Sequence, residues 1–162
     1  YKNATFSFDL NGYHFIILTT DIREDLDEND GGIYKAQCMS EKEIDWLKED
    51  LVKNRLPCII FTHFGLAEDK QIGNYWFEKN PENGLMNNRQ DVKEIIKSDD
   101  NIIAVFSGHQ HWTKQLKEDG KNYYVVGSLI DNIDMLGIPD GIYLEVELED
   151  SHVRILEKHI EL

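Results

Sequence analysis

Two histidines stand two residues apart at the end of an apolar segment. The segment runs from Ile102 to Phe106, and Ser107-Gly108 separates it from His109 and His111. Buried strands read as continuous apolar runs, and ligands of open α/β sheets bind just beyond their carboxyl ends. Neutral imidazole is the commonest metal ligand in proteins, and if the backbone stays extended both rings point to one side. The spacing suggests a metal site, with surface or hydrogen-bonded histidines as the alternative.

A second histidine-bearing strand is expected earlier in the chain. Pro57 is followed by the apolar run Cys58 to Thr62 and then by His63. A helix predicted over residues 88–97 lies between this run and the next, and a helical crossover brings two parallel strands to the same sheet edge. His63, His109 and His111 are therefore the candidate metal ligands.

The other elements predict an α/β fold of mixed β-sheets flanked by helices. Asn11-Gly12 and Asp119-Gly120 are hairpin signals, and Ser40 with Glu43 forms a capping box that starts a helix. The expected order is β-β-α-β-α-β followed by a β-rich tail, with strands over 5–10, 13–19, 58–62, 102–106, 113–117, 123–126, 142–148 and 153–160. His14 falls within a strand and is expected to be structural.

Residues 64–87 form a long irregular insertion that contains Tyr75-Trp76-Phe77. Loops of this length without regular structure are usually functional or disordered. The aromatic side chains could stack on a substrate ring, or they could fix the loop to the core.

Composition limits the classes of function. The 162 residues are 41% hydrophobic, enough for one domain with a core, and 31 acidic against 17 basic residues give a net charge of −14. This balance argues against a surface for a nucleic-acid polymer, and no apolar run is long enough to span a membrane. The two cysteines, Cys38 and Cys58, indicate neither a disulfide framework nor a thiolate zinc site. Low cysteine use favours a cytoplasmic protein, while the compartment stays open.

The strand Phe61-Thr62-His63, the loop from Ser107 to His111 and the helix Glu43-Ile44-Asp45-Trp46-Leu47 together resemble the C-terminal half of a calcineurin-like metallophosphoesterase. This resemblance covers essentially residues 1–162, as a single domain or as the C-terminal portion of one. It implies a β-sandwich flanked by helices and a centre of two divalent ions. His63 and His109 would bind one ion and His111 the other. Manganese, iron or zinc suits such nitrogen and oxygen ligands.

The same resemblance implies hydrolysis of a phosphomonoester, a phosphodiester or a pyrophosphate link. The substrate would be small and phosphorylated, and the segments 87–89 and 127–129 resemble the branch that acts on nucleotide diphosphates and phosphodiesters. The family's D-x-H, G-D and G-N-H-[DE] motifs do not precede Phe6. Asp150-Ser151-His152 is interpreted as a turn and Gly73-Asn74-Tyr75 lacks the histidine, so neither is assigned as a ligand. The expected proton donor is not in this chain, which by itself should be incomplete.

Two other classes remain open. A degenerate module could keep the fold as a non-catalytic binding domain without the metals. A zinc hydrolase of the metallo-β-lactamase type would use the pattern H-x-H-x-D-H, but here Thr113 and Lys114 occupy the places of the aspartate and the last histidine.

Overall fold

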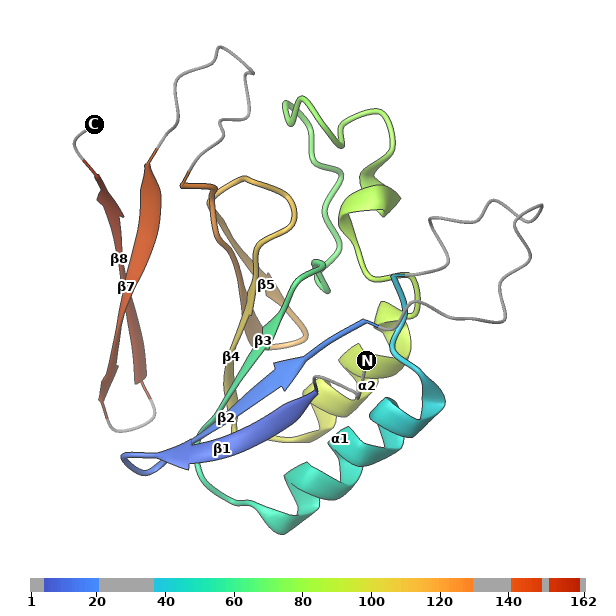
Figure 1. The fold of residues 1–162 in the computed structure, drawn as a ribbon, viewed down its shortest axis with the longest axis vertical. Coiled ribbons are helices and arrows are strands. Elements are labelled where there is room, and N and C mark those ends of the chain that lie inside the picture. The colour runs from blue at the N-terminus through green and yellow to red at the C-terminus, as the bar shows by residue number, and fades with distance from the viewer. Residues whose placement is uncertain (1–4, 21–36, 130–140, 150–151, 161–162) are drawn as a thin grey trace.

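The fold is a six-stranded mixed sheet with two helices on one face and a β-hairpin on the other (Figure 1). It is taken from a computed structural model, which describes residues 5–20, 37–129, 141–149 and 152–160. The strands of the sheet lie in the order β1-β2-β3-β4-β6-β5. Their bounds are β1 Phe6–Leu10, β2 Tyr13–Leu18, β3 Cys58–Thr62, β4 Ile102–Ser107, β5 Lys114–Glu118 and β6 Lys121–Val125. This confirms the expected α/β class.

The central strands β2, β3, β4 and β6 run parallel, so their carboxyl ends meet at one edge of the sheet. β1 and β5 are antiparallel edge strands, each joined to its neighbour by a hairpin turn. In both turns the two central residues have positive φ, at 51° and 82° for Asn11 and Gly12 and at 50° and 80° for Asp119 and Gly120. Paired positive φ values match the twist of the flanking strands, which confirms the hairpin signals.

Helices α1, Glu41–Lys53, and α2, Arg89–Ser98, lie side by side on the same face of the sheet (Figure 1). The predicted capping box begins α1, because the Ser40 hydroxyl accepts from the Glu43 amide and the Glu43 carboxylate accepts from the Ser40 amide. Leu47 and Ile96 are fully buried against Ile16 and Ile60 of the sheet. This layer is the main hydrophobic core.

The opposite face of the sheet carries aromatic side chains. Phe61, Phe106 and Tyr124 stack in a row across β3, β4 and β6, with ring centroids 5.3 and 5.1 Å apart. The hairpin of β7, Ile142–Glu149, and β8, His152–His159, packs Leu144 and Ile155 near this row. It forms a second sheet of two strands that packs on the first.

Strand β1 turns its apolar side away from the helices. The alternation of apolar and polar residues along β1 did not indicate which side would face them. Ser7 points toward α1 and donates to Asp50, whereas Phe6 and Phe8 are 50% and 44% exposed on the aromatic face. The inner side of β1 is polar because it faces a hydrogen-bonded group centred on His14. The hairpin β7–β8 covers the neighbouring strands but leaves these rings accessible.

His14 is structural, as predicted from its place within a strand. Its ring is 3% exposed, with Nδ1 2.6 Å from Asp9 Oδ1 and Nε2 2.8 Å from Asp50 Oδ2. Asn54, which follows α1, also donates to Asp9 at 2.8 Å. These contacts connect the β1–β2 hairpin to the C-terminal end of α1.

Candidate functional site

His63 and His109 meet where β3 and β4 end. His63 Nε2 lies 2.9 Å from His109 Nδ1, a hydrogen-bonding distance at which one ring donates to the other. The backbone holds the two loops together, because the carbonyl oxygen of His63 accepts from the amides of Gly108 and His109 at 3.2 and 2.9 Å. The two parallel strands therefore bring both predicted histidines to one point, although 46 residues separate them along the chain.

The environment keeps both rings neutral at neutral pH. Burial lowers the pKa of His63, and nearby His111 lowers it further. Burial lowers the pKa of His109 to about 4, and the charges that His63 and His111 would carry act in the same direction. A hydrogen bond that the His109 ring donates to the Asn83 backbone opposes this shift. A neutral imidazole has one nitrogen with a lone pair, and in this contact the lone pair of one facing nitrogen accepts the proton carried by the other.

His111 lies close enough for its charge to affect both other rings, but the extended backbone assumed for it is wrong. β4 ends at Ser107, and the chain then turns, with the His111 amide donating to the Gly108 carbonyl at 3.2 Å. His111 has φ of 50°, in the left-handed region, so the alternation of side chains along a strand does not apply to it. The turn, rather than strand periodicity, sets the direction of its side chain.

The insertion 64–87 packs directly on the histidine pair. The rings of Phe64 and Phe77 have centroids 4.4 and 5.3 Å from that of His109. These contacts contribute to the partial burial of His109, and of the three consecutive aromatic residues only Phe77 makes such a contact. Tyr75 and Trp76 are instead 63% and 44% exposed.

Buried polar side chains join the insertion to the histidine loop, and sequence reasoning missed them. Gln110, between the two histidines, is 2% exposed, and its Nε2 donates to the Gly84 carbonyl at 3.3 Å. Asn74 is fully buried and donates to the Gln110 carbonyl at 2.9 Å. A Cβ added at Gly65 would lie 2.6 Å from Gln110 Nε2. The glycines of the insertion were the one available signal, because glycine permits close approach of segments.

An ion-pair network fixes the insertion to α2. Arg89 forms a two-pronged contact with Glu68 at 2.7 and 3.0 Å and another with Glu82 at 2.9 and 3.2 Å. The hydrogen bond from Arg89 holds the pKa of Glu68 below its usual range. Asn88 bonds both backbone groups of Met39. The short 3-10 helix η2, Pro81–Gly84, carries Glu82 within this framework.

The histidine pair fits part of a metal site. Two imidazoles converge, and imidazole nitrogen is a ligand that manganese, iron and zinc accept. As the rings stand, the facing nitrogens share a hydrogen bond. Within residues 5–20, 37–129, 141–149 and 152–160, no group of three or more His, Cys, Asp or Glu side chains is arranged to hold an ion. Asp21, Asp131 and Asp134 are acidic residues that could also serve as ligands, and all three fall outside those ranges. The described part of the chain thus brings two imidazoles together without a third His, Cys, Asp or Glu side chain to complete an ion site.

The described residues of the other motifs noted in the sequence make contacts within the fold that account for them without a metal ion. Lys114 binds Asp69 at 2.8 Å and lies 4.7 Å from the Trp112 ring centroid, which leaves the H-x-H-x-D-H reading without support. In the segment Gly73-Asn74-Tyr75, the side-chain oxygen of Asn74 accepts hydrogen bonds from the amides of Trp76 and Phe77. These bonds give Asn74 a structural role in the insertion. Asp150 and Ser151 lie outside the described residues, and His152 begins β8.

The fold resembles that of one solved phosphatase. A dimetal phosphatase from Danio rerio matches with a TM-score of 0.58 at 15% identity, over 78% of this chain and 49% of that chain. A candidate 5′-nucleotidase from Staphylococcus aureus, solved with α-ketoglutarate, matches with a TM-score of 0.42 at 11% identity, over 78% of this chain and 24% of that one. No protein-family model and no curated protein matches the sequence. The chain has the fold of a phosphoesterase, and spans about half the length of the phosphatase it matches.

Proposed function

We propose that this chain provides the imidazole ligands of a two-metal phosphoesterase centre. The observation that carries the proposal is the convergence of His63 and His109, 2.9 Å apart and both neutral, at the carboxyl edge of adjacent parallel strands. Ligand sites of open α/β sheets lie at this edge. The likeness in fold to a dimetal phosphatase is consistent with this assignment.

Each part of the chain has a defined role in the proposed centre. His63 and His109 would hold one ion and His111 the other, while Gln110 and the insertion fix the two loops in place. Phe64 and Phe77 limit the access of water to the His109 ring. When bound, two divalent ions supply an activated water and stabilise the charge that develops on the transferred phosphoryl group.

The proposed substrate is a small phosphorylated molecule, with a phosphomonoester, a phosphodiester or a pyrophosphate link at the bond that is cleaved. A nucleotide-like compound is one candidate. The ions would also explain how a protein with a net charge of −14 binds an anion, because a bound metal dominates the local field.

A centre of two ions 3.5–4 Å apart requires an anionic ligand to offset their charge, and the described residues place no carboxylate at the histidine pair. We propose that the carboxylate ligands and the proton donor come from polypeptide other than the described residues, as the upstream motifs of the family that the sequence resembles imply. The same observation favours a second candidate, a degenerate module that keeps the fold and binds no metal. Metal content separates the two.

The test is elemental analysis of the protein with its remaining ligand-bearing segments present, after reconstitution with manganese, iron or zinc. We expect about two ions per chain, whereas less than about half an ion favours the degenerate module. His109→Ala should lower metal affinity and phosphoesterase activity by more than tenfold, since even residues that only orient a ligand typically contribute about 10–100-fold.

The matched control for this substitution is His159→Ala on β8, where the ring lies 3.2 Å from Glu157 on an exposed face. It should leave metal content and rate unchanged. Full occupancy and normal rates in the His109→Ala protein would show that the site assignment is wrong.

A further inference from the structure

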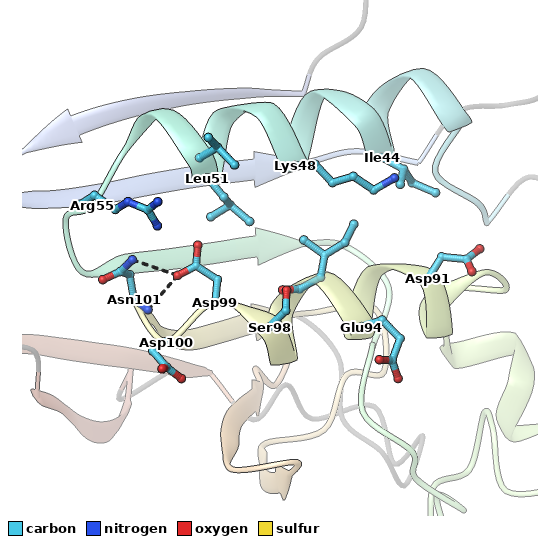
Figure 2. A pocket seen from close by; sticks show the side chains of 12 residues that line it. Ile44, Lys48, Leu51, Arg55, Asp91, Glu94, Ser98, Asp99, Asp100 and Asn101 are labelled. Atoms are coloured by element: carbon cyan, nitrogen blue, oxygen red, sulfur yellow. Dashed lines mark hydrogen bonds between the residues drawn. The ribbon is translucent and has the colours of Figure 1, made fainter.

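A groove runs between α1 and α2 on the side of the molecule away from the sheet (Figure 2). Its volume is about 810 Å³, within the range of about 300–1,000 Å³ typical of ligand sites. The histidine pair is not among the residues that line it. The groove is therefore separate from the proposed metal centre.

The floor of the groove is apolar. Ile44 of α1 and Ile95 of α2 pack on the core cluster but remain partly exposed, and Leu51 closes the floor between them. Val52, on the outer part of α1, is 69% exposed. An apolar strip flanked by two helices is the surface on which a third helix packs its own apolar stripe.

The two rims carry opposite charge. Lys48 and Arg55 stand on the α1 side, and Figure 2 shows the carboxylates along the α2 side. These carboxylates are Asp91, Glu94, Asp99 and Asp100. The α2 rim is the more strongly charged, and among the described residues no ion pair neutralises Asp91, Glu94 or Asp100. Such a rim attracts a basic segment, and the net charge of −14 favours the approach of one.

We propose that this groove binds an amphipathic helix of a partner protein. The helix places an apolar stripe on Ile44, Leu51 and Ile95, with lysines or arginines along the α2 rim and acidic residues along the α1 rim. Helix α1 has 13 residues, so a partner helix of about 20 Å, or about 13 residues at 1.5 Å each, matches the length of the groove. Apolar residues at positions i, i+3, i+4 and i+7 supply the affinity, and the two charged flanks set the direction of the bound helix.

The experiment measures binding of a fluorescein-labelled 14-residue helical peptide to the 162-residue chain by fluorescence anisotropy at about 0.15 M ionic strength. The peptide carries leucines at i, i+3, i+4 and i+7, lysines on one flank and glutamates on the other. A scrambled peptide has the same composition without the stripe, and a third peptide has glutamate on both flanks. We expect saturable binding of the first peptide alone.

Charge reversal on the rim provides the decisive comparison. Asp91→Lys with Glu94→Lys should weaken binding of the lysine-flanked peptide by about tenfold or more, and the variant should gain affinity for the glutamate-flanked peptide. Glu78→Lys with Glu149→Lys makes the same change in net charge at exposed positions outside the groove and should leave binding unchanged. Val52→Asp should weaken binding because it places a charge on the exposed apolar surface of α1 that lines the groove. Circular dichroism confirms that each variant is folded.

Several results would overturn the proposal. One is binding of the scrambled peptide as tight as that of the striped peptide. Another is an equal loss of affinity in the Asp91/Glu94 and Glu78/Glu149 double variants. A third is the absence of saturable binding of the striped peptide up to about 1 mM, the weak limit of measurable association. Dimerisation of the chain that the peptide displaces and Val52→Asp abolishes would assign the groove to a second copy instead.

Discussion

At the scale of single residues, burial and position set the chemistry of each histidine. His63 and His109 are held together, neutral, at a sheet edge, whereas His14 lies between two carboxylates inside the fold. Their different positions were predictable from the sequence. His63 and His109 each follow an apolar strand, whereas His14 lies within a strand. The 2.9 Å contact of His63 with His109 was not, because it depends on a turn that also gives His111 a positive φ.

The group around His14 predicts how stability responds to acid. The hydrogen bond from His14 lowers the pKa of Asp9 below its ordinary value of 3.8, with a further contribution from Asn54. A carboxylate with a lowered folded-state pKa stabilises the protein above its unfolded value and loses that contribution as pH falls through the folded value. We expect the free energy of unfolding to fall below about pH 4, and Asp9→Asn to flatten this part of the profile.

The measurement is urea unfolding of both proteins between about pH 2 and pH 5. Asp45→Asn is a suitable control, since Asp45 is exposed and pairs only with Lys48 at the next turn of α1. An unchanged slope in Asp9→Asn would contradict the role given to this contact.

At the scale of elements, local signals in the sequence were sufficient for the hairpins and for α1. Asn11-Gly12 and the Ser40 capping box act within a few residues, so their consequences can be read without the rest of the chain. The direction of β1 and the anchoring of the insertion were not predictable in this way. Phe8 faces outward because His14 and Asp50 occupy the inner side, and Arg89 reaches Glu68 across 21 residues.

The packing of the insertion gives a prediction at the scale of elements. A Cβ on Gly65 would lie 2.6 Å from Gln110 Nε2 and 2.9 Å from Leu85 Cδ2, closer than side chains tolerate. Gly65→Ala should therefore move Gln110, loosen the loop that carries His109 and His111, and lower the free energy of unfolding by about 1–3 kcal/mol. Thermal unfolding measures the loss.

Gly108→Ala is the matched control, because a Cβ there meets no atom within 4 Å. Its effect on stability should stay within about 0.5 kcal/mol. Equal losses in the two variants would indicate that backbone freedom, rather than the close approach to Gln110, determines the cost.

At the scale of the whole molecule, part of the aromatic face of the sheet is left uncovered. Phe6, Phe8 and Leu10 extend the apolar face beyond the hairpin β7–β8, and 44–54% of each is exposed. A contiguous apolar patch of this kind marks a surface that normally contacts other polypeptide. Within the described residues, the imidazoles that follow the carboxyl ends of β3 and β4 have no carboxylate grouped with them. Both features agree with our proposal that further polypeptide completes the domain.

The last prediction follows from that proposal. Supplied alone with manganese, iron or zinc, the 162-residue chain should hydrolyse a chromogenic phosphodiester at least about 100-fold more slowly than a protein that also contains the remaining ligands. The physical reason is that His63, His109 and His111 cannot by themselves offset the charge of two adjacent divalent ions. The assay compares metal-dependent turnover with and without a chelator. Rapid chelator-sensitive turnover by the chain alone would refute the proposal and point to Asp21, Asp131 and Asp134, whose replacement by Asn should then abolish it.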